Sequence, residues 1–237
     1  MSKSKILVWD LPTRAFHWLL ALSFAGAWLT GESERWRDVH LLLGYTVLGL
    51  IAFRLLWGLA GTRYARFASF ALAPRKLLDY LRSLAAFRPR HYVGHNPAGS
   101  WAILALIALL AATAATGWAA YAEIGPKWLE GLHEGTAKVS LALVLLHVTA
   151  VVASSLLHRE NLVAAMVSGY KRGPGEAAAG TRWPVALLLV GAVGAFWAGL
   201  IPAPGLPPGT ALTSLVVKGK PVLADRPRQR HAEHDDD

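Results

Sequence analysis

Residues 132–157 read LHEGTAKVSLALVLLHVTAVVASSLL, an apolar stretch long enough to cross a lipid bilayer as a helix. The stretch carries two histidines, His133 and His147, which are fourteen residues apart. At 100° and 1.5 Å per residue, this spacing returns to within about 40° of one helix face and separates the two rings by about 21 Å. The stretch therefore predicts a membrane helix that presents two imidazoles on one face, at two depths.

The composition indicates an integral membrane protein. Hydrophobic residues make up 54% of the 237 residues and charged residues only 16%, with a mean hydropathy of +0.37. This leaves too little charge to coat a water-soluble globule. The net charge of +9 is also typical of nucleic-acid binders, but those carry Lys and Arg as one dense patch. Here the basic residues flank long apolar runs, so nucleic acid is excluded as a partner.

Five apolar stretches approach the length of about 20 residues that a helix needs to span the hydrocarbon core. We expect them to cross the membrane in an all-α fold, and they are Pro12–Thr30, Val39–Ala60, Pro97–Tyr121, Thr136–Leu157 and Pro184–Ile201. The connections on the N-terminal side hold fourteen Lys and Arg residues, and those on the other side hold four. Cytoplasmic loops carry such an excess, so the N-terminus is expected in the cytoplasm and the C-terminal tail outside.

Three further segments have a character of their own. Residues 61–96 are too polar to cross, and an amphipathic helix that begins at Pro74 is expected to lie on the inner membrane surface or to pack against the bundle. Residues 173–202 hold a linker and the fifth, C-terminal transmembrane helix. Residues 203–237 are rich in proline and then in mixed charge, so this tail is expected to be disordered and exposed.

Histidine is the main candidate for metal chemistry in this chain. There is no cysteine, which excludes disulfides, thiolate-bound iron–sulfur clusters, structural zinc on sulfur and thioether-attached haem. Four of the nine histidines lie in or at the ends of the expected spans, and they are His17, His40, His133 and His147. Each alone could be a histidine hydrogen-bonded to a neighbouring helix. Four polar rings at membrane depth together indicate a functional site.

The depths of these four histidines arrange them in two pairs. His40 opens the second span at the level of His133, and His17 lies one turn into the first span, toward the level of His147. Two pairs of opposed imidazoles in a helical bundle suit two haems, each iron being held by two nitrogens. Zinc fits less well, because its sites need three or four close protein ligands. Filling both axial positions of a haem favours electron transfer over oxygen binding.

Two arginines and two glycines support this interpretation. Arg14 stands three residues before His17, and Arg54 lies near the inner end of the second span, so both are candidates to bind haem propionates. The alternative for Arg54 is that its guanidinium extends to lipid headgroups. Gly44 and Gly135 would let a flat macrocycle approach the backbone, although glycine is common in membrane helices.

Five segments carry a more specific signal. They read WDLPTRAFHW (9–18), HLLLGYTVLGLIAFRLLWGLAG (40–61), HNPAGSW (95–101), LHEGTAKVSLALVLLH (132–147) and HRENLVAAMVSGYK (158–171). Together they resemble the bacterial di-haem b-type cytochromes that serve as membrane subunits of nickel–iron hydrogenases and formate dehydrogenases. The resemblance implies a four-helix transmembrane bundle over residues 1–172 that binds two b-type haems through the four histidines named above.

The resemblance also implies a bacterial inner-membrane location and electron transfer between a periplasmic redox partner and membrane quinone. Because this chain cannot build a second redox centre, the partner is expected to be an iron–sulfur subunit like that of a hydrogenase, or a c-type cytochrome. Asn96 and Gly99 match positions of the quinone pocket, and the alternative is an ordinary helix N-terminus. Lys171 is expected to bind lipid headgroups.

Other function classes stay open on the sequence alone. One is a stand-alone quinone-coupled oxidoreductase that acts on a small substrate such as superoxide. Another is a haem-free transporter that relays protons through histidines. A third is a membrane anchor that only holds partners. A haem-containing cytochrome is red, whereas the haem-free proteins are colourless, so haem content separates these classes.

Overall fold

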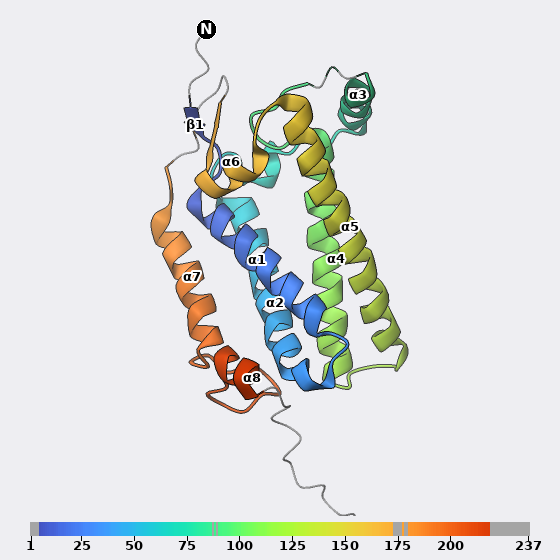
Figure 1. Cartoon of the computed structure of the whole chain (residues 1–237), viewed down its shortest axis with the longest axis vertical. Helices are drawn as coiled ribbons and strands as arrows, with labels where there is room; N and C mark the ends of the chain where they lie inside the picture. Colours follow the sequence, from blue (N-terminus) through green and yellow to red (C-terminus); the bar gives the residue numbers. More distant parts are fainter. Residues whose placement is uncertain (1–4, 87, 89, 173–176, 178–179, 219–237) are drawn as a thin grey trace, which may run out of the picture.

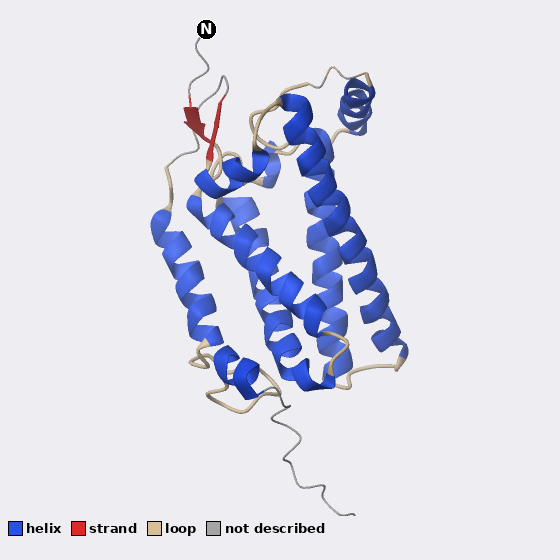
Figure 2. Cartoon of the chain, in the orientation of Figure 1, coloured by secondary structure: helices blue, strands red, loops and turns tan. Residues whose placement is uncertain are grey.

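The long apolar runs of the sequence become the long helices of the computed structural model, which describes residues 5–86, 88, 90–172, 177 and 180–218. Figures 1 and 2 show a bundle of helices with two short strands at one end. The helices are α1 (Leu11–Thr30), α2 (Arg37–Ala60), α3 (Pro74–Ala85), α4 (Pro97–Tyr121), α5 (Trp128–His158), α6 (Leu162–Ser168), α7 (Trp183–Trp197) and α8 (Leu212–Lys218). Short 3-10 turns cover Glu34–Trp36 and Phe67–Ser69, and the strands are β1 (Lys5–Leu7) and β2 (Tyr170–Arg172).

The starts of α1 and α4 follow directly from local sequence. Asp10 accepts a hydrogen bond from the Thr13 backbone N–H at 2.8 Å, and Asn96 accepts one from the Gly99 backbone N–H at 2.7 Å. Each cap is followed by a proline in the first turn, where the missing N–H costs nothing. As a result, α4 has the bounds that the sequence predicts.

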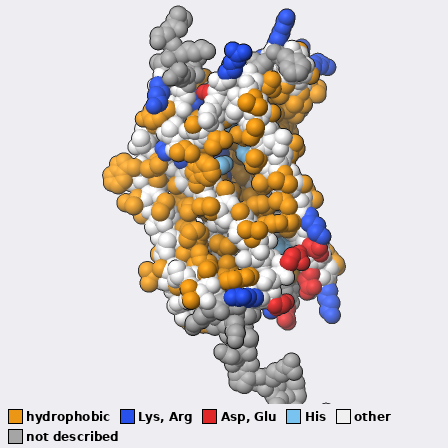
Figure 3. Space-filling model, in the orientation of Figure 1, with side chains coloured by type: hydrophobic (Ala, Val, Ile, Leu, Met, Phe, Trp, Pro, Cys, Tyr) orange, Lys and Arg blue, Asp and Glu red, His pale blue; other side chains and the backbone are white. Residues whose placement is uncertain are grey.

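Three helices are long and apolar enough to cross a membrane, and they lie over residues 34–60, 97–121 and 128–158. Figure 3 shows the corresponding band of hydrophobic side chains between two ends that carry the charges. The prediction of five spans is thus confirmed for three. The fifth is shorter than predicted, because α7 ends at Trp197 rather than Ile201 and its 15 residues cover only about 22 Å.

Helix packing divides the bundle into two halves. α4 packs along α5, α1 packs along α2, and α2 joins the halves through α4. Within the described ranges, α5 makes no comparably extensive contact with α1 or α2, and only 6% of its apolar window is buried. Ser140, midway between the two histidines of α5, is fully buried, with its Oγ 3.3 Å from Thr113 Oγ1 on α4. The predicted histidine-bearing face therefore includes this contact with α4.

One end of the bundle holds the N-terminal strand and most of the basic loops, and we call it the basic end. β1 pairs antiparallel with β2, so that Lys5 stands opposite Arg172. Asp10 is fully buried there, and its carboxylate accepts hydrogen bonds from Trp57 Nε1 at 3.1 Å and Thr62 Oγ1 at 2.5 Å. This one carboxylate ties the start of α1 to the end of α2.

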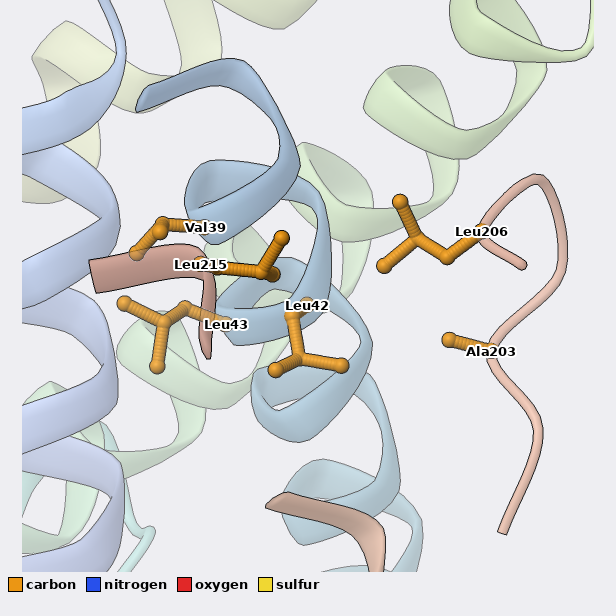
Figure 4. Close-up of a cluster of buried hydrophobic side chains, with 6 residues drawn as sticks. All are labelled: Val39, Leu42, Leu43, Ala203, Leu206 and Leu215. Carbon is orange, nitrogen blue, oxygen red and sulfur yellow. The ribbon is translucent and has the colours of Figure 1, made fainter. Parts of the chain in front are cut away.

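The opposite end corrects the expectation of disorder for residues 203–218. Ala203, Leu206 and Leu215 pack against Val39, Leu42 and Leu43 of α2 in one buried cluster, which Figure 4 shows. Tyr121 at the end of α4 donates a hydrogen bond to the Gly205 carbonyl at 3.1 Å. The sequence suggested disorder because it is rich in proline and glycine, but its few large apolar residues find a hydrophobic surface on α2. Residues 219–237 lie outside the described part of the chain.

The amphipathic helix predicted from Pro74 is present as α3, and it packs against α4. Tyr80 of this helix is buried, with its ring 5.7 Å from that of Tyr92. Leu78 and Leu81 remain exposed on the helix surface. The helix thus packs on the bundle, as the second alternative predicts, and its contact with the inner membrane surface stays a prediction.

Candidate metal centre

His40 and His133 meet at the end of the bundle opposite the basic end. His40 lies in the first turn of α2 and His133 in the second turn of α5. Their ring centroids are 6.0 Å apart, and the ring planes are inclined at 82°. The structure thus brings together two residues that are 93 positions apart and that the depth argument assigns to one level.

Backbone carbonyls of two other helices orient both rings. The Nδ1–H of His40 donates to the Ala27 carbonyl of α1 at 2.8 Å, and the Nδ1–H of His133 donates to the Thr113 carbonyl of α4 at 2.8 Å. A carbonyl only accepts, so each Nδ1 carries the proton and each Nε2 keeps its lone pair. This is the tautomer and support that a metal-ligating histidine needs.

Glycines around this pair show where space is tight and where it is open. A Cβ added at Gly117 would come within 2.7 Å of the His133 ring, so the ring needs glycine at this position of α4. A Cβ at Gly44 or Gly135 would meet no atom within 4 Å in the described chain. Sequence reasoning chose the two glycines beside open space and missed Gly117, because the contact joins two helices.

The second pair, His17 and His147, lies nearer the basic end. His147 is within electrostatic range of the His17 ring, and His17 also stands edge-on to Trp18 at 5.2 Å. The Nδ1 of His17 is buried and has no hydrogen-bond partner among the residues that the structure covers. An unpaired buried nitrogen is costly, so this site is polar and incomplete as the chain alone forms it.

Arg54 occupies a position on α2 that corresponds to the position of His147 on α5. It follows His40 by fourteen residues, just as His147 follows His133, so both lie about 21 Å from the first pair. Arg54 is only 3% exposed, and its guanidinium lies 4.7 Å from the centroid of Phe67. The alternative that it extends to lipid headgroups is therefore wrong, because the side chain points into the bundle.

The side chain of Arg14 connects α1 to α6. Its Nη2 donates to the Val167 carbonyl of α6, so the guanidinium ties α1 to the segment that follows α5. Its Nε is buried without a hydrogen-bond partner in the described ranges. One edge of this guanidinium is thus used by the fold, and another polar atom stays available to an anionic group.

Asn96 and Gly99 together form the N-cap of α4. The residue before them, His95, was not selected from the sequence and lies between the rings of Trp9 at 4.5 Å and Phe70 at 4.8 Å. Removal from water, followed by the positive charges of Arg54 and Lys171, lowers the pKa of His95 to about 3. His95 is therefore neutral at physiological pH, and it could be recognised only once the loop was folded.

Lys171 does not reach the lipid headgroups. Its side chain is 8% exposed, forms an ion pair with Glu160 at 3.3 Å and donates to the Tyr92 carbonyl at 3.2 Å. The prediction of a headgroup contact is wrong because β2, which carries Lys171, pairs with β1 and turns the side chain inward.

The described residues contain no cluster of three or more His, Cys, Asp or Glu that could hold a metal ion by themselves. The structure instead brings histidines together in pairs. Two histidines suffice for a metal cofactor whose other ligands come from the cofactor itself.

The chain matches the family model of prokaryotic cytochrome b561 over residues 8–169. It is similar to proteins named "Probable Ni/Fe-hydrogenase B-type cytochrome subunit" from three bacteria. The one from Rhodobacter capsulatus is 21% identical, over 71% of this chain and 82% of the relative. Those from Azotobacter vinelandii and Cupriavidus necator are 26% and 25% identical, over 71% and 69% of this chain and 89% and 86% of the relatives.

No solved structure gives a significant match to this chain. The family model, by contrast, covers more than half of it and includes all four membrane histidines. The chain therefore belongs to the prokaryotic cytochrome b561 family, and it is a membrane electron-transfer cytochrome of the b type.

Proposed function

We propose that this cytochrome holds two haem b groups, one between His40 and His133 and one between His17 and His147, and that it couples a periplasmic redox partner to membrane quinone. The observation that carries the proposal is the His40–His133 pair with its 6.0 Å separation and its two Nδ1 hydrogen bonds. A third ring nitrogen, Nδ1 of His17, is buried without a partner among the described residues.

The geometry of the first pair fits one shared iron. Metal–imidazole bonds of about 2 Å on each side of one ion place the two ring centroids about 6 Å apart, and the observed distance is 6.0 Å. Both rings keep Nε2 for the metal because Nδ1 is committed to a carbonyl. Held by these two imidazoles, a haem would supply reversible one-electron transfer.

The surroundings also fit haem. A Cβ at Gly44, one turn after His40, would meet no atom within 4 Å in the described chain. The weak packing of α5 against α1 and α2 leaves the faces of these helices free for a flat group. Arg54 places a buried positive charge at the depth of His147 and is suited to bind a propionate there. Arg14, three residues before His17, is the second candidate for this role.

We further propose that the basic end faces the cytoplasm of a bacterial inner membrane. The excess of Lys and Arg in the connections at this end supports that orientation. A quinone would then be reduced or oxidised near the second histidine pair, beside Asn96, Gly99 and His95. The buried imidazole of His95, wedged between two aromatic rings, offers a neutral hydrogen-bonding group next to that site.

The redox partner is proposed to bind at the end that carries His40 and His133. The relatives' names associate them with nickel–iron hydrogenase, which favours an iron–sulfur subunit of such an enzyme over a c-type cytochrome. This chain has no cysteine and so brings no iron–sulfur cluster of its own. The two histidine pairs, separated by about 21 Å along α5, would carry electrons across most of the hydrocarbon core.

Haem stoichiometry tests the proposal. The purified full chain should contain about two haems by pyridine haemochrome and show a reduced-minus-oxidised b-type band. About one haem per chain would contradict the second haem site, and a colourless protein would contradict both sites. Quinone coupling is tested separately, because addition of a quinol analogue to the oxidised protein should reduce the haems only if quinone is a substrate.

A further inference from the structure

Two adjoining cavities lie at the basic end, where α5 ends and α6 begins. The first has a volume of about 480 Å³ and is lined by residues from four segments of the chain, three of which contribute charged side chains. The second has a volume of about 300 Å³ and is lined largely by Val152, Leu156 and Val163. Arg159, Glu160 and Asn161 line both cavities, so the charged space and the apolar space are continuous.

The first cavity carries an excess of positive charge. Lys5, Arg159 and Lys171 line it, whereas Glu160 is the only carboxylate among its described lining residues. Lys171 and Glu160 neutralise each other through their 3.3 Å ion pair. The charges of Lys5, whose Nζ lies 4.9 Å from the centroid of the Tyr170 ring, and of Arg159 remain for an anion.

Glu160 gives the first cavity a buried hydrogen-bond acceptor that has no donor in the described chain. One carboxylate oxygen, Oε2, contacts Lys171. The other, Oε1, is buried and accepts no hydrogen bond from the described residues. A buried acceptor without a donor is costly, so the group that fills the cavity is expected to donate to this oxygen as well as to present an anion to the cations.

The second cavity is suited to a hydrocarbon chain. Leu156 is 73% exposed, and Val152 and Val163 are about half exposed, although all three are aliphatic. They lie on the last turns of the apolar helix α5 and on the first turn of α6, on a surface that faces lipid if α5 spans the bilayer. The groove therefore leads from the charged cavity along the hydrocarbon region.

We propose that the two cavities together bind one anionic phospholipid with hydroxyl groups in its head, of the phosphatidylglycerol type. Its phosphodiester lies between Lys5 and Arg159, a headgroup hydroxyl donates to Oε1 of Glu160, and an acyl chain follows the groove of Val152, Leu156 and Val163. The bound lipid would contact β1, the end of α5 and α6 at one place.

This ligand satisfies features that other candidates leave unmatched. The head of an oxidised quinone is uncharged, so it would leave the charges of Lys5 and Arg159 unneutralised, and it has no N–H or O–H to donate to Glu160 Oε1. A free phosphate would leave the aliphatic groove unfilled. Phosphatidylcholine has the phosphate and the chains, but its quaternary ammonium has no N–H or O–H to donate.

The test is lipid titration of the detergent-purified full chain, followed by native mass spectrometry. Phosphatidylglycerol should bind with one tight site, at least tenfold more tightly than phosphatidylcholine with the same acyl chains. The double variant Lys5→Gln/Arg159→Asn should weaken phosphatidylglycerol binding about 30-fold, because it removes two cations. Asparagine suits position 159, where the backbone is left-handed with φ 52°. Val163→Trp, which narrows the groove, should also weaken binding.

The matched control is Arg75→Gln/Lys76→Gln on α3, which removes two exposed cations at the same end but outside both cavities. It should leave phosphatidylglycerol binding unchanged, and unaltered haem absorbance in every variant should show that the fold is retained. Equal loss in the control, or equal affinity for the two lipids, would overturn the proposal. So would displacement of the lipid by inorganic phosphate, which indicates a free-anion site, or by a quinone analogue, which assigns the cavity to quinone.

Discussion

Each ring nitrogen of His40 and His133 has a defined task. Nδ1 is engaged with a backbone carbonyl of a neighbouring helix, so neither imidazole can rotate without breaking a 2.8 Å hydrogen bond. Such support is typical of metal-ligating histidines, because it fixes both the tautomer and the ring direction. Nε2 of each ring is the nitrogen proposed to bind the metal, since Nδ1 is engaged with a carbonyl.

Substitution of one histidine in each pair tests the pairing. His133→Ala should lower the haem content from about two to about one per chain, because one axial ligand of one haem is lost. His147→Ala should remove the other haem, with a different change in the reduced-minus-oxidised spectrum. The control is His91→Ala, since His91 is exposed and its ring lies against that of His158. Two haems retained in both His133→Ala and His147→Ala would show that the pairing is wrong.

Arg54 provides a second test at the scale of single residues. Removal of a buried positive charge near a haem disfavours the reduced, more electron-rich form, so Arg54→Gln should lower the midpoint potential of one haem. A shift of roughly 60 mV, or about 1.4 kcal/mol, is expected for a one-electron couple. Spectroelectrochemical titration measures it. The control is Arg82→Gln, at an exposed position on α3, which should leave both midpoint potentials unchanged. If Arg54→Gln shifts neither midpoint potential, Arg54 does not lie near a haem.

Among the elements, α8 contributes packing that sequence composition concealed. Leu215 is 3% exposed in the cluster with Val39, Leu42 and Leu43, directly beneath the first turns of the helix that carries His40. Trp197, the last residue of α7, donates from Nε1 to Thr46 Oγ1 at 3.0 Å on the same part of α2. The C-terminal segment therefore supports the end of α2 at which the first histidine pair lies.

This support predicts a stability effect. Leu215→Ala should lower the free energy of unfolding by about 2–3 kcal/mol, because it removes buried methyl groups and leaves a cavity. Val217, two residues away, is 82% exposed, so Val217→Ala should change stability by less than about 0.5 kcal/mol. Thermal unfolding in detergent, followed by haem absorbance, compares the two variants. Equal stability of both would mean that α8 does not pack on α2 in solution.

For the whole molecule, orientation in the membrane is the property that function depends on most. The basic end is proposed to face the cytoplasm, which places the His40–His133 pair on the side of a periplasmic partner. The absence of cysteine makes this testable with single introduced thiols. Ser69→Cys should be protected from a membrane-impermeant maleimide in intact spheroplasts, and Glu32→Cys should be labelled, because the two exposed residues lie at opposite ends. The reverse pattern would invert the proposed direction of coupling.

Local chemistry in the sequence was sufficient for the long helices. Apolar length predicted α2, α4 and α5 as membrane helices, and the Asn-Pro pair at 96–97 predicted the first residue of α4. Periodicity along α5 placed His133 and His147 on one face, since a helix turns by a fixed angle per residue. These features depend on neighbours in the chain, and that is why they could be read without a structure.

Only the tertiary structure decided what distant segments do to one another. It ended α7 at Trp197 and packed residues 203–218 on α2, against the expectation from their proline content. It turned Arg54 and Lys171 inward, placed His95 between Trp9 and Phe70, and set Gly117 against His133. The physical reason is that burial and hydrogen bonding of a side chain depend on which surface folds against it, and here those surfaces come from other helices.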